Sequence, residues 1–383
     1  MQADFHYYAT YCASYLAGHT HEESLAICYS AQFVDRCTKS LLTEIKAPLQ
    51  AATTQSQTEL LGVSTDIIGL QDITRIWAAF HFLPGDLKAP VKGLKGYKNK
   101  YRLICAPNSD LLVQTVELAK NKDLQSVGIA MHVLADTWAH RNFAGTPSMV
   151  INNTDGYFFE ILPDGSERKV IFSHNPGSSD DIENGHFTNT VYNVGETTIM
   201  NLGHGRAGHL PDYSFIRYKY MPAWDRYREC LKDNPTEYYK AFCQMIYAMK
   251  YLKGESDIFE KDTYDEEAVA PYKDRIMSII TKKQLDASAD WKAFGEELSG
   301  NVIPDFEDLR YAEEYKAADK ASADNTFLGR FIIAAMAQKS MVTHEIYKSG
   351  NMLAGFSIDY NKKGFGGIRD YLKLVEATVR VRK

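Results

Sequence analysis

The segment HVLADTWAH places His132, Asp136 and His140 at intervals of four residues. Steps of four residues advance by only about 40° around an α-helix, so the three side chains form one stripe. The residues around them are mostly apolar, which predicts a buried helix, and an unpaired carboxylate is strongly disfavoured there. A divalent cation resolves this conflict, because two imidazoles and a carboxylate are ligands that zinc accepts. The alternative is a simple hydrogen bond between His and Asp one turn apart on a surface.

Further histidines and carboxylates lie on or after the other predicted helices of the N-terminal half. A first helix is expected over residues 4–17, and a second follows the capping box THEE at residues 20–23. A third helix, near residues 65–80, stops before the turn signal Pro84-Gly85. Taken singly, each histidine also fits a satisfied core position. The candidate ligands from these helices and from the irregular segment after the motif are His6, Asp35, His81, His204, His209 and Asp212.

These motifs resemble the zinc-dependent phospholipase C superfamily, which also includes the single-strand-specific nucleases. HVLADTWAH matches its His-x3-Asp-x3-His core, and three shorter segments stand in the order of its other motifs. The likeness covers roughly residues 1–215, and the opening and the AQFVD segment resemble an uncharacterised bacterial branch. The three shorter segments are Phe5-His6-Tyr7, Gln32-Phe33-Val34-Asp35 and Phe80-His81.

The resemblance implies a cluster of two or three zinc ions held among helices. It assigns one ion to Asp35, His81, His132 and Asp136, a second to His140, His209 and Asp212, and a third to His6 with Asp136 bridging. Asp35 and Asp136 are the residues expected to take part in catalysis. Two departures from the superfamily pattern leave alternatives open. The spacing before Asp212 keeps His204 open in place of His209, and no leader is visible whose removal would create the N-terminal residue that completes the third ion.

The expected function is metal-dependent hydrolysis of phosphate esters, as in a phospholipase C-like phosphodiesterase. Zinc ions lower the pKa of bound water and clamp the attacking and leaving oxygens of a phosphate ester. The net charge of −6 and the lack of a basic run favour a small phosphoester or a phospholipid-like substrate over double-stranded nucleic acid. The alternative is a non-catalytic helical module with a structural metal and a protein-binding C-terminal region. HExxH and Walker A patterns are absent from the sequence.

Two further sets of residues are candidates for contacts with a substrate. Arg141 follows the motif and is a candidate phosphate contact, although a solvated surface arginine fits equally well. The second set consists of aromatic residues that would line a pocket or belong to the core, namely Tyr7, Trp77, Trp138 and Phe143.

The helical patterns predict a mainly α protein with a multi-helix, phospholipase C-like core and a small β-hairpin insertion. Residues 1–215 are expected to form the metal-binding helical core, with the insertion near residues 150–175 and a turn at Asp164-Gly165. Residues 216–383 are expected to form a helical C-terminal extension packed on that core, with a first helix at 222–252.

The termini and cysteines bear on location. The opening MQADFHYYAT has no basic or apolar signal region, and no run of 18 apolar residues occurs. The six cysteines form no CxxC pair and are expected to be free, buried thiols in a reducing compartment. We therefore expect a cytoplasmic protein without a transmembrane segment, with leaderless export as the alternative.

Overall fold

A computed structural model describes most of the chain. The described residues are 1–56, 58–60, 67–89, 102–146, 153–173, 178–189 and 203–351, without the side chains of 67–70. The end of the predicted C-terminal extension, from residue 352 onward, lies outside them.

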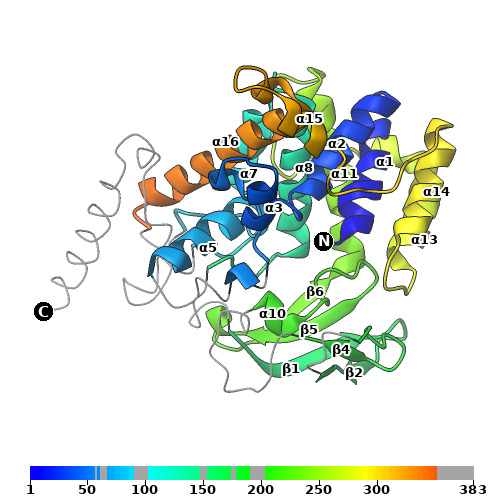
Figure 1. The fold of residues 1–383 in the computed structure, drawn as a ribbon. Helices are drawn as coiled ribbons and strands as arrows, with labels where there is room; N and C mark the ends of the chain where they lie inside the picture. The colour runs from blue at the N-terminus through cyan, green and yellow to red at the C-terminus, as the bar shows by residue number, and fades with distance from the viewer. Residues whose placement is uncertain are drawn as a thin grey trace, which may run out of the picture.

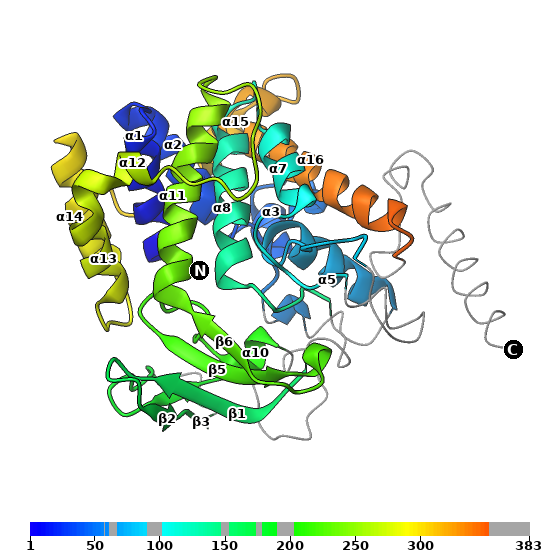
Figure 2. The ribbon, with the colours of Figure 1, turned by 180° about the vertical axis from the view of Figure 1, so that it is seen from behind.

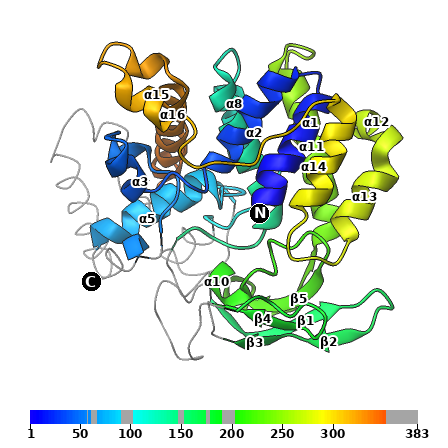
Figure 3. The same ribbon diagram turned by 45° about the vertical axis from the view of Figure 1, so that its right-hand side comes forward.

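The protein is mainly α, as the sequence predicts, with helices stacked above a small sheet (Figure 1). The N-terminus lies between the two layers (Figures 1 and 3). A π-helix opens the chain, a rare form that is frequent at functional sites. The helices are η1 (Asp4–Ala9), α1 (Thr10–Leu16), α2 (His21–Phe33), α3 (Lys39–Glu44), α5 (Ile67–Phe80), α7 (Asp110–Leu118), α8 (Leu124–Ala139), α10 (His204–Ala207), α11 (Asn234–Leu252), α12 (Glu266–Val269), α13 (Lys273–Thr281), α14 (Ser288–Ser299), α15 (Ala312–Ala317) and α16 (Phe327–Lys348).

Local sequence signals explain several helix ends. Thr20 accepts a hydrogen bond from the Glu23 backbone and the Glu23 side chain accepts one from the Thr20 backbone, which confirms the predicted capping box of α2. Gly18, with φ of 81°, takes the left-handed conformation that ends α1. Ser109 caps α7 by accepting from the Leu112 backbone. These local signals therefore set where α1 ends and where α2 and α7 begin.

Helix α8 is the central helix of the fold. Almost every side chain from Gln125 to Ala139 is buried, and α2, α11, α16, α7 and α5 pack around it. Figure 2 shows α8 and α11 side by side above the sheet. Gly128 lets α2 approach closely, because a Cβ there would lie 2.4 Å from the Ile27 carbonyl oxygen. One hydrophobic core runs from Met1 to Ile346 and therefore includes helices on both sides of residue 215.

The sheet is larger than the predicted insertion and continues past residue 215. Its four strands pair antiparallel in the order β2-β1-β5-β6, and β3 and β4 form a separate parallel pair. The predicted hairpin is confirmed, since Gly165, with φ of 83°, lies in the turn between β1 and β2. The strands are β1 (Thr154–Ile161), β2 (Glu167–Lys169), β3 (Ile171–Ser173), β4 (His186–Thr188), β5 (Arg217–Pro222) and β6 (Cys230–Asp233).

The predicted helix at residues 222–252 is wrong over its first part. Residues 222–233 hold the end of β5, a turn and β6, and α11 begins only at Asn234. Tyr218 and Tyr220 are fully buried on β5, so packing favours a strand where the sequence pattern is ambiguous. Pro235 in the first turn of α11 marks the true start.

A second hydrophobic cluster joins the sheet to the ends of α5 and α8. It includes Phe82 and Phe143, which lie two and four residues after the ends of those helices, and Phe158 and Tyr220 from the sheet. The junction between helices and sheet is therefore filled by buried aromatic side chains. No helix in the described part of the chain combines the length and apolar character needed to cross a membrane.

Candidate metal centre

Several segments place polar side chains at one point at this junction. His6 lies on η1, Asp35 in the turn after α2, and His81 directly after α5. The stripe on α8 supplies His132 and Asp136, both buried. Because α8 packs against α2 and α5, residues far apart in sequence meet over its stripe.

The carboxylate of Asp136 is at the middle of this cluster. Its Oδ1 accepts from the Met1 amino group at 2.8 Å and lies 3.1 Å from His6 Nε2. Its Oδ2 lies 3.1 Å from His81 Nδ1 and 3.2 Å from His132 Nε2. The His6 and His132 rings stack with centroids 3.8 Å apart. One carboxylate thus faces nitrogen atoms from four positions of the chain.

The hydrogen bonds of the His81 and His140 rings indicate that each ring, when neutral, turns an acceptor nitrogen toward the cluster. His81 Nε2 lies 3.0 Å from the Thr53 carbonyl oxygen, and His140 Nδ1 lies 2.7 Å from the His81 carbonyl oxygen. Carbonyl oxygens only accept, so these ring nitrogens donate, and in a neutral ring the other nitrogen is an acceptor. His81 Nδ1 then faces an oxygen of Asp136, and two acceptors in contact repel unless a proton or metal ion lies between them. Such carbonyl bonds also orient histidine ligands in metal sites.

Asp35 lies at the more open edge of the cluster. Its side chain is 27% exposed, and its oxygens lie 3.9 Å from His6 Nε2, 3.7 Å from His81 Nδ1 and 3.8 Å from His132 Nε2. Burial raises the pKa of Asp35, and the negative charge of Asp136 adds to the rise against the pull of His6. The ligand atoms of Asp35, His6 and His132 lie within 4.8 Å of one another, so one ion could contact these three residues.

A second group lies on the far side of Asp136. His140 Nε2 lies 3.4 Å from Asp212 Oδ1, and His204 Nε2 lies 3.3 Å from Asp212 Oδ2. The His140 and His204 rings meet edge to face with centroids 4.8 Å apart. Phe82, which belongs to the second hydrophobic cluster, stacks on His140 with ring centroids 4.7 Å apart. Two imidazoles and a carboxylate therefore converge here as well.

His209 was predicted for this group, and the structure places His204 there instead. The His209 side chain is 54% exposed, and its Nδ1 lies 3.7 Å from Asp212. Gly208, with φ of 58°, turns the chain after α10 and leaves His209 on the solvent side. His204 starts α10, which Figure 3 shows between the sheet and the helices.

Burial makes most of the rings neutral. It lowers the pKa of His6, His132 and His140 to about 4 in each case, so these nitrogens are free to act as ligands near pH 7. His81 differs: burial would lower its pKa as well, but the hydrogen bond to Asp136 outweighs that effect and raises it. A proton on His81 is thus the alternative to a metal ion beside Asp136.

The carboxylates leave the cluster with surplus negative charge. Burial would raise the pKa of Asp136 and Asp212, but neighbouring histidines and the Met1 amino group hold both well below the usual range. The Met1 amino group lies 3.3 Å from Asp212 and is itself buried, and the carboxylates overcome burial to raise its pKa to about 11. Three carboxylates, counting Asp35, face one ammonium group, which favours binding of divalent cations.

The donor atoms fit zinc. Three groups in the described residues have ligand atoms within 4.8 Å of one another, and two of these groups share His132. Each combines imidazole nitrogens with carboxylate oxygens, the set that zinc accepts. The groups are His6–Asp35–His132, His81–His132–Asp136 and His140–His204–Asp212.

The other predicted contacts have structural partners. Arg141 pairs with Glu237 through Nε at 3.1 Å and does not stand free to meet a phosphate. Tyr7, Trp138 and Phe143 are buried in the two hydrophobic clusters. Trp77 is partly buried, and its Nε1 donates to Gln55 at 3.2 Å. All six cysteines are free thiols, as predicted; five are buried and Cys230 is partly exposed.

The Thr53 carbonyl is a part of the centre that sequence reasoning missed, and the part played by the N-terminal residue was left open there. The short spacing from Met1 to His6 is a usable signal for the N-terminal group, because Met1 lies shortly before the helical segment that carries His6. No sequence signal points to the Thr53 carbonyl, since every residue type has a backbone carbonyl group.

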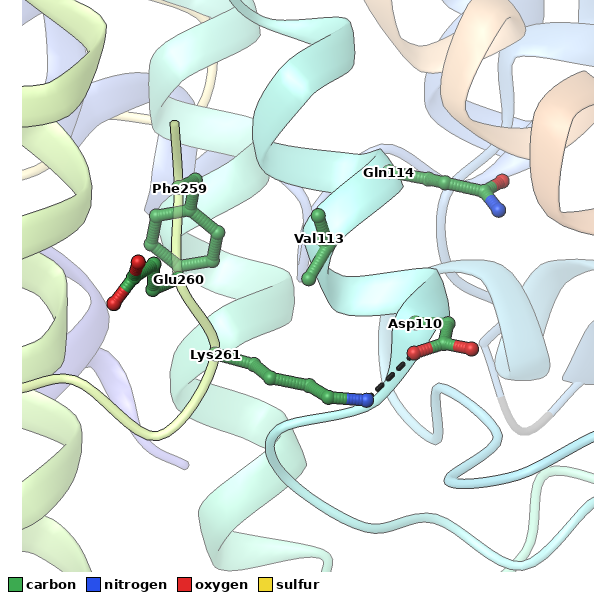
Figure 4. Close-up of a pocket in the computed structure, with 6 residues that line it drawn as sticks. All are labelled: Asp110, Val113, Gln114, Phe259, Glu260 and Lys261. Atoms are coloured by element: carbon green, nitrogen blue, oxygen red, sulfur yellow. Dashed lines mark hydrogen bonds and ion pairs between the residues drawn. The ribbon is translucent and has the colours of Figure 1, made fainter. Parts of the chain in front are cut away.

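A surface hollow elsewhere offers no comparable chemistry. It lies between α7 and the segment 259–261 and is lined by Val113, Gln114, Phe259 and Glu260 around an exposed ion pair (Figure 4). That pair joins Lys261 Nζ to Asp110 Oδ1 at 2.6 Å.

The chain belongs to the family of unknown function DUF6765, which it matches over residues 1–346. No curated protein and no solved structure gives a significant match.

Proposed function

We propose that the protein is a zinc-dependent hydrolase of phosphate esters with a phospholipase C-like helical core. The observation that carries the proposal is the contact between His81 Nδ1 and Asp136 Oδ2 at 3.1 Å. In the neutral ring, the bond to Thr53 makes that nitrogen an acceptor, so two acceptors would face each other in a buried site unless a metal ion or a proton lies between them. The order of the sequence motifs supports the choice of superfamily, because each of those motifs contributes a residue to the centre.

The ligands would divide between two principal ions. His81, His132, Asp136 and Asp35 would hold the first, and His140, His204 and Asp212 the second. His6, with Asp136 bridging, would hold a third. Zinc bound there supplies a water of lowered pKa and polarises a phosphoryl oxygen.

The protein's own groups have separate tasks in this reaction. Asp136 is almost fully buried and holds its ring partners in place. Asp35 is the more exposed carboxylate, and its raised pKa suits it to accept a proton from an attacking water. The carbonyl oxygens of Thr53 and His81 orient the His81 and His140 rings.

The substrate we propose is a small phosphoester or a phospholipid-like molecule. The net charge of −6 disfavours binding that depends on many phosphate contacts along a duplex. Asp35 and His204, at 27% and 25% exposure, are the ligands that a substrate would reach first.

Metal analysis combined with a hydrolysis assay tests the proposal. We expect two or three zinc ions per chain and hydrolysis of bis(p-nitrophenyl) phosphate that a chelator abolishes and zinc restores. The His132→Ala variant should lose bound zinc and should lose hydrolysis, because His132 belongs to two of the three groups of ligands. His186→Ala is the matched control, since His186 is exposed on β4. Zinc binding without turnover of any phosphoester would refute the enzyme and favour the structural-metal alternative.

A further inference from the structure

A fully buried lysine lies at the end of the helix that carries the metal ligands. The Lys232 side chain, on β6, has no exposed surface. Its Nζ donates to the carbonyl oxygens of Trp138 at 2.9 Å and Ala139 at 3.0 Å, and it pairs with Glu237 on α11. These two carbonyls belong to the last residues of α8, where helix carbonyls lack partners within the helix.

The carbonyl groups that this lysine binds directly precede a ligand of the second group, the one at His140, His204 and Asp212. His140 directly follows Ala139 and is the C-cap of α8. The His140 ring is held by its bond to the His81 carbonyl, and the backbone just before it is held by Lys232. Backbone and ring are thus anchored separately, and His140 Nε2 points toward Asp212.

Burying an ion pair costs desolvation energy that its attraction alone rarely exceeds. Glu237 is 7% exposed and also accepts from Arg141, so the network joins β6, α8 and α11. An apolar side chain would join these elements as firmly, but it would leave the carbonyl groups of α8 without a donor. The need for a donor explains why a lysine stands here.

We propose that Lys232 is a positioning residue for the second ion, the one at His140, His204 and Asp212. This rests on the proposed function only in requiring that the centre binds metal. Lys232 has no contact with the ligand side chains themselves. It holds the last turn of α8, so that His140 Nε2 meets His204 and Asp212 at the distances seen.

The test is a zinc titration of Lys232→Met, in competition with a chelating dye, with wild type alongside. Methionine has a similar length and no charge, so the change removes the donor. We expect the second ion to bind about 10- to 100-fold more weakly, as for other outer partners of metal ligands, while the ion at His81, His132 and Asp136 keeps its affinity. Lys232→Arg, which keeps a charged donor, should recover part of the loss.

Lys219→Met is the matched control. Lys219 is also a largely buried lysine of the sheet, 10% exposed, and pairs with Glu167 at 2.6 Å and Glu229 at 3.0 Å. Its ion pairs and ring contacts are with Glu167, Glu229, Tyr157 and Phe159, none of which lies on α8, so its loss should leave both zinc affinities unchanged.

The outcomes separate this inference from the proposed function. Unchanged affinity for the second ion in Lys232→Met, or equal weakening of both ions, overturns the positioning role. If that variant does not fold, Glu237→Gln is measured in its place, because it removes the charge that pairs with Lys232 and keeps the lysine. This variant must weaken the binding of the second ion alone. Two wild-type zinc ions without phosphoesterase activity refute the enzyme but leave this test intact. A wild type without zinc overturns both.

Discussion

The choice between His204 and His209 gives the sharpest test of the centre. Structural zinc in four-ligand peptides is bound with about 10–16 kcal/mol, or about 2.5–4 kcal/mol per ligand. Because about 1.4 kcal/mol is tenfold in affinity, loss of one ligand should weaken binding by about 100- to 1000-fold. His204 lies 3.3 Å from Asp212 and against the His140 ring, whereas His209 is 54% exposed.

We therefore expect His204→Ala to lose the second ion and His209→Ala to keep it. Zinc content after gel filtration, followed by competition with a chelating dye, measures both. The two variants differ only in which histidine of one short segment is removed, so each is the control of the other. A His209→Ala protein that loses an ion while His204→Ala retains two would refute the reasoning.

Three further predictions concern stability. Asp136→Asn should destabilise the chelator-treated protein by about 1.5–3 kcal/mol in urea unfolding, because it removes the charge of the 2.8 Å partner of the buried Met1 ammonium and leaves Asp212 at 3.3 Å as its charged partner; a loss below about 0.5 kcal/mol would contradict this. The pKa values of His6, His132 and His140 are about 4 in the folded protein and about 6.5 in the unfolded chain. Between pH 4 and pH 6.5 the unfolded chain therefore binds more protons than the folded protein. Each ring should therefore cost the metal-free protein up to about 1.4 kcal/mol per pH unit as pH falls from 6.5 toward 4, measured by urea midpoints, and a flat profile would argue against buried neutral rings. Gly128→Ala should cost about 3 kcal/mol and reduce zinc affinity, since its Cβ would meet the α2 backbone at 2.4 Å; unchanged thermal unfolding would show that α2 can move.

Much of the helical framework could be predicted because its signals are local. The capping box of α2, the Ser109 cap and the Gly165 turn each depend on residues within one turn of one another. The strands β5 and β6 could not be predicted in the same way. The pairing of β5 with β1 links residues 158–160 to 218–220, β6 pairs in turn with β5, and burial of Tyr218 and Tyr220 favours the strand.

The sequence by itself determined which chemical groups the centre has and that the stripe of α8 needs partners. Four-residue spacing on an apolar helix is sufficient for that, since helix geometry is regular. Only the tertiary structure decided which groups meet, including His204 in place of His209, the Met1 amino group and the carbonyls that orient the rings. The physical reason is that contacts near 3 Å between segments more than 50 residues apart depend on how whole helices pack, and residue spacing along the chain carries no record of that packing.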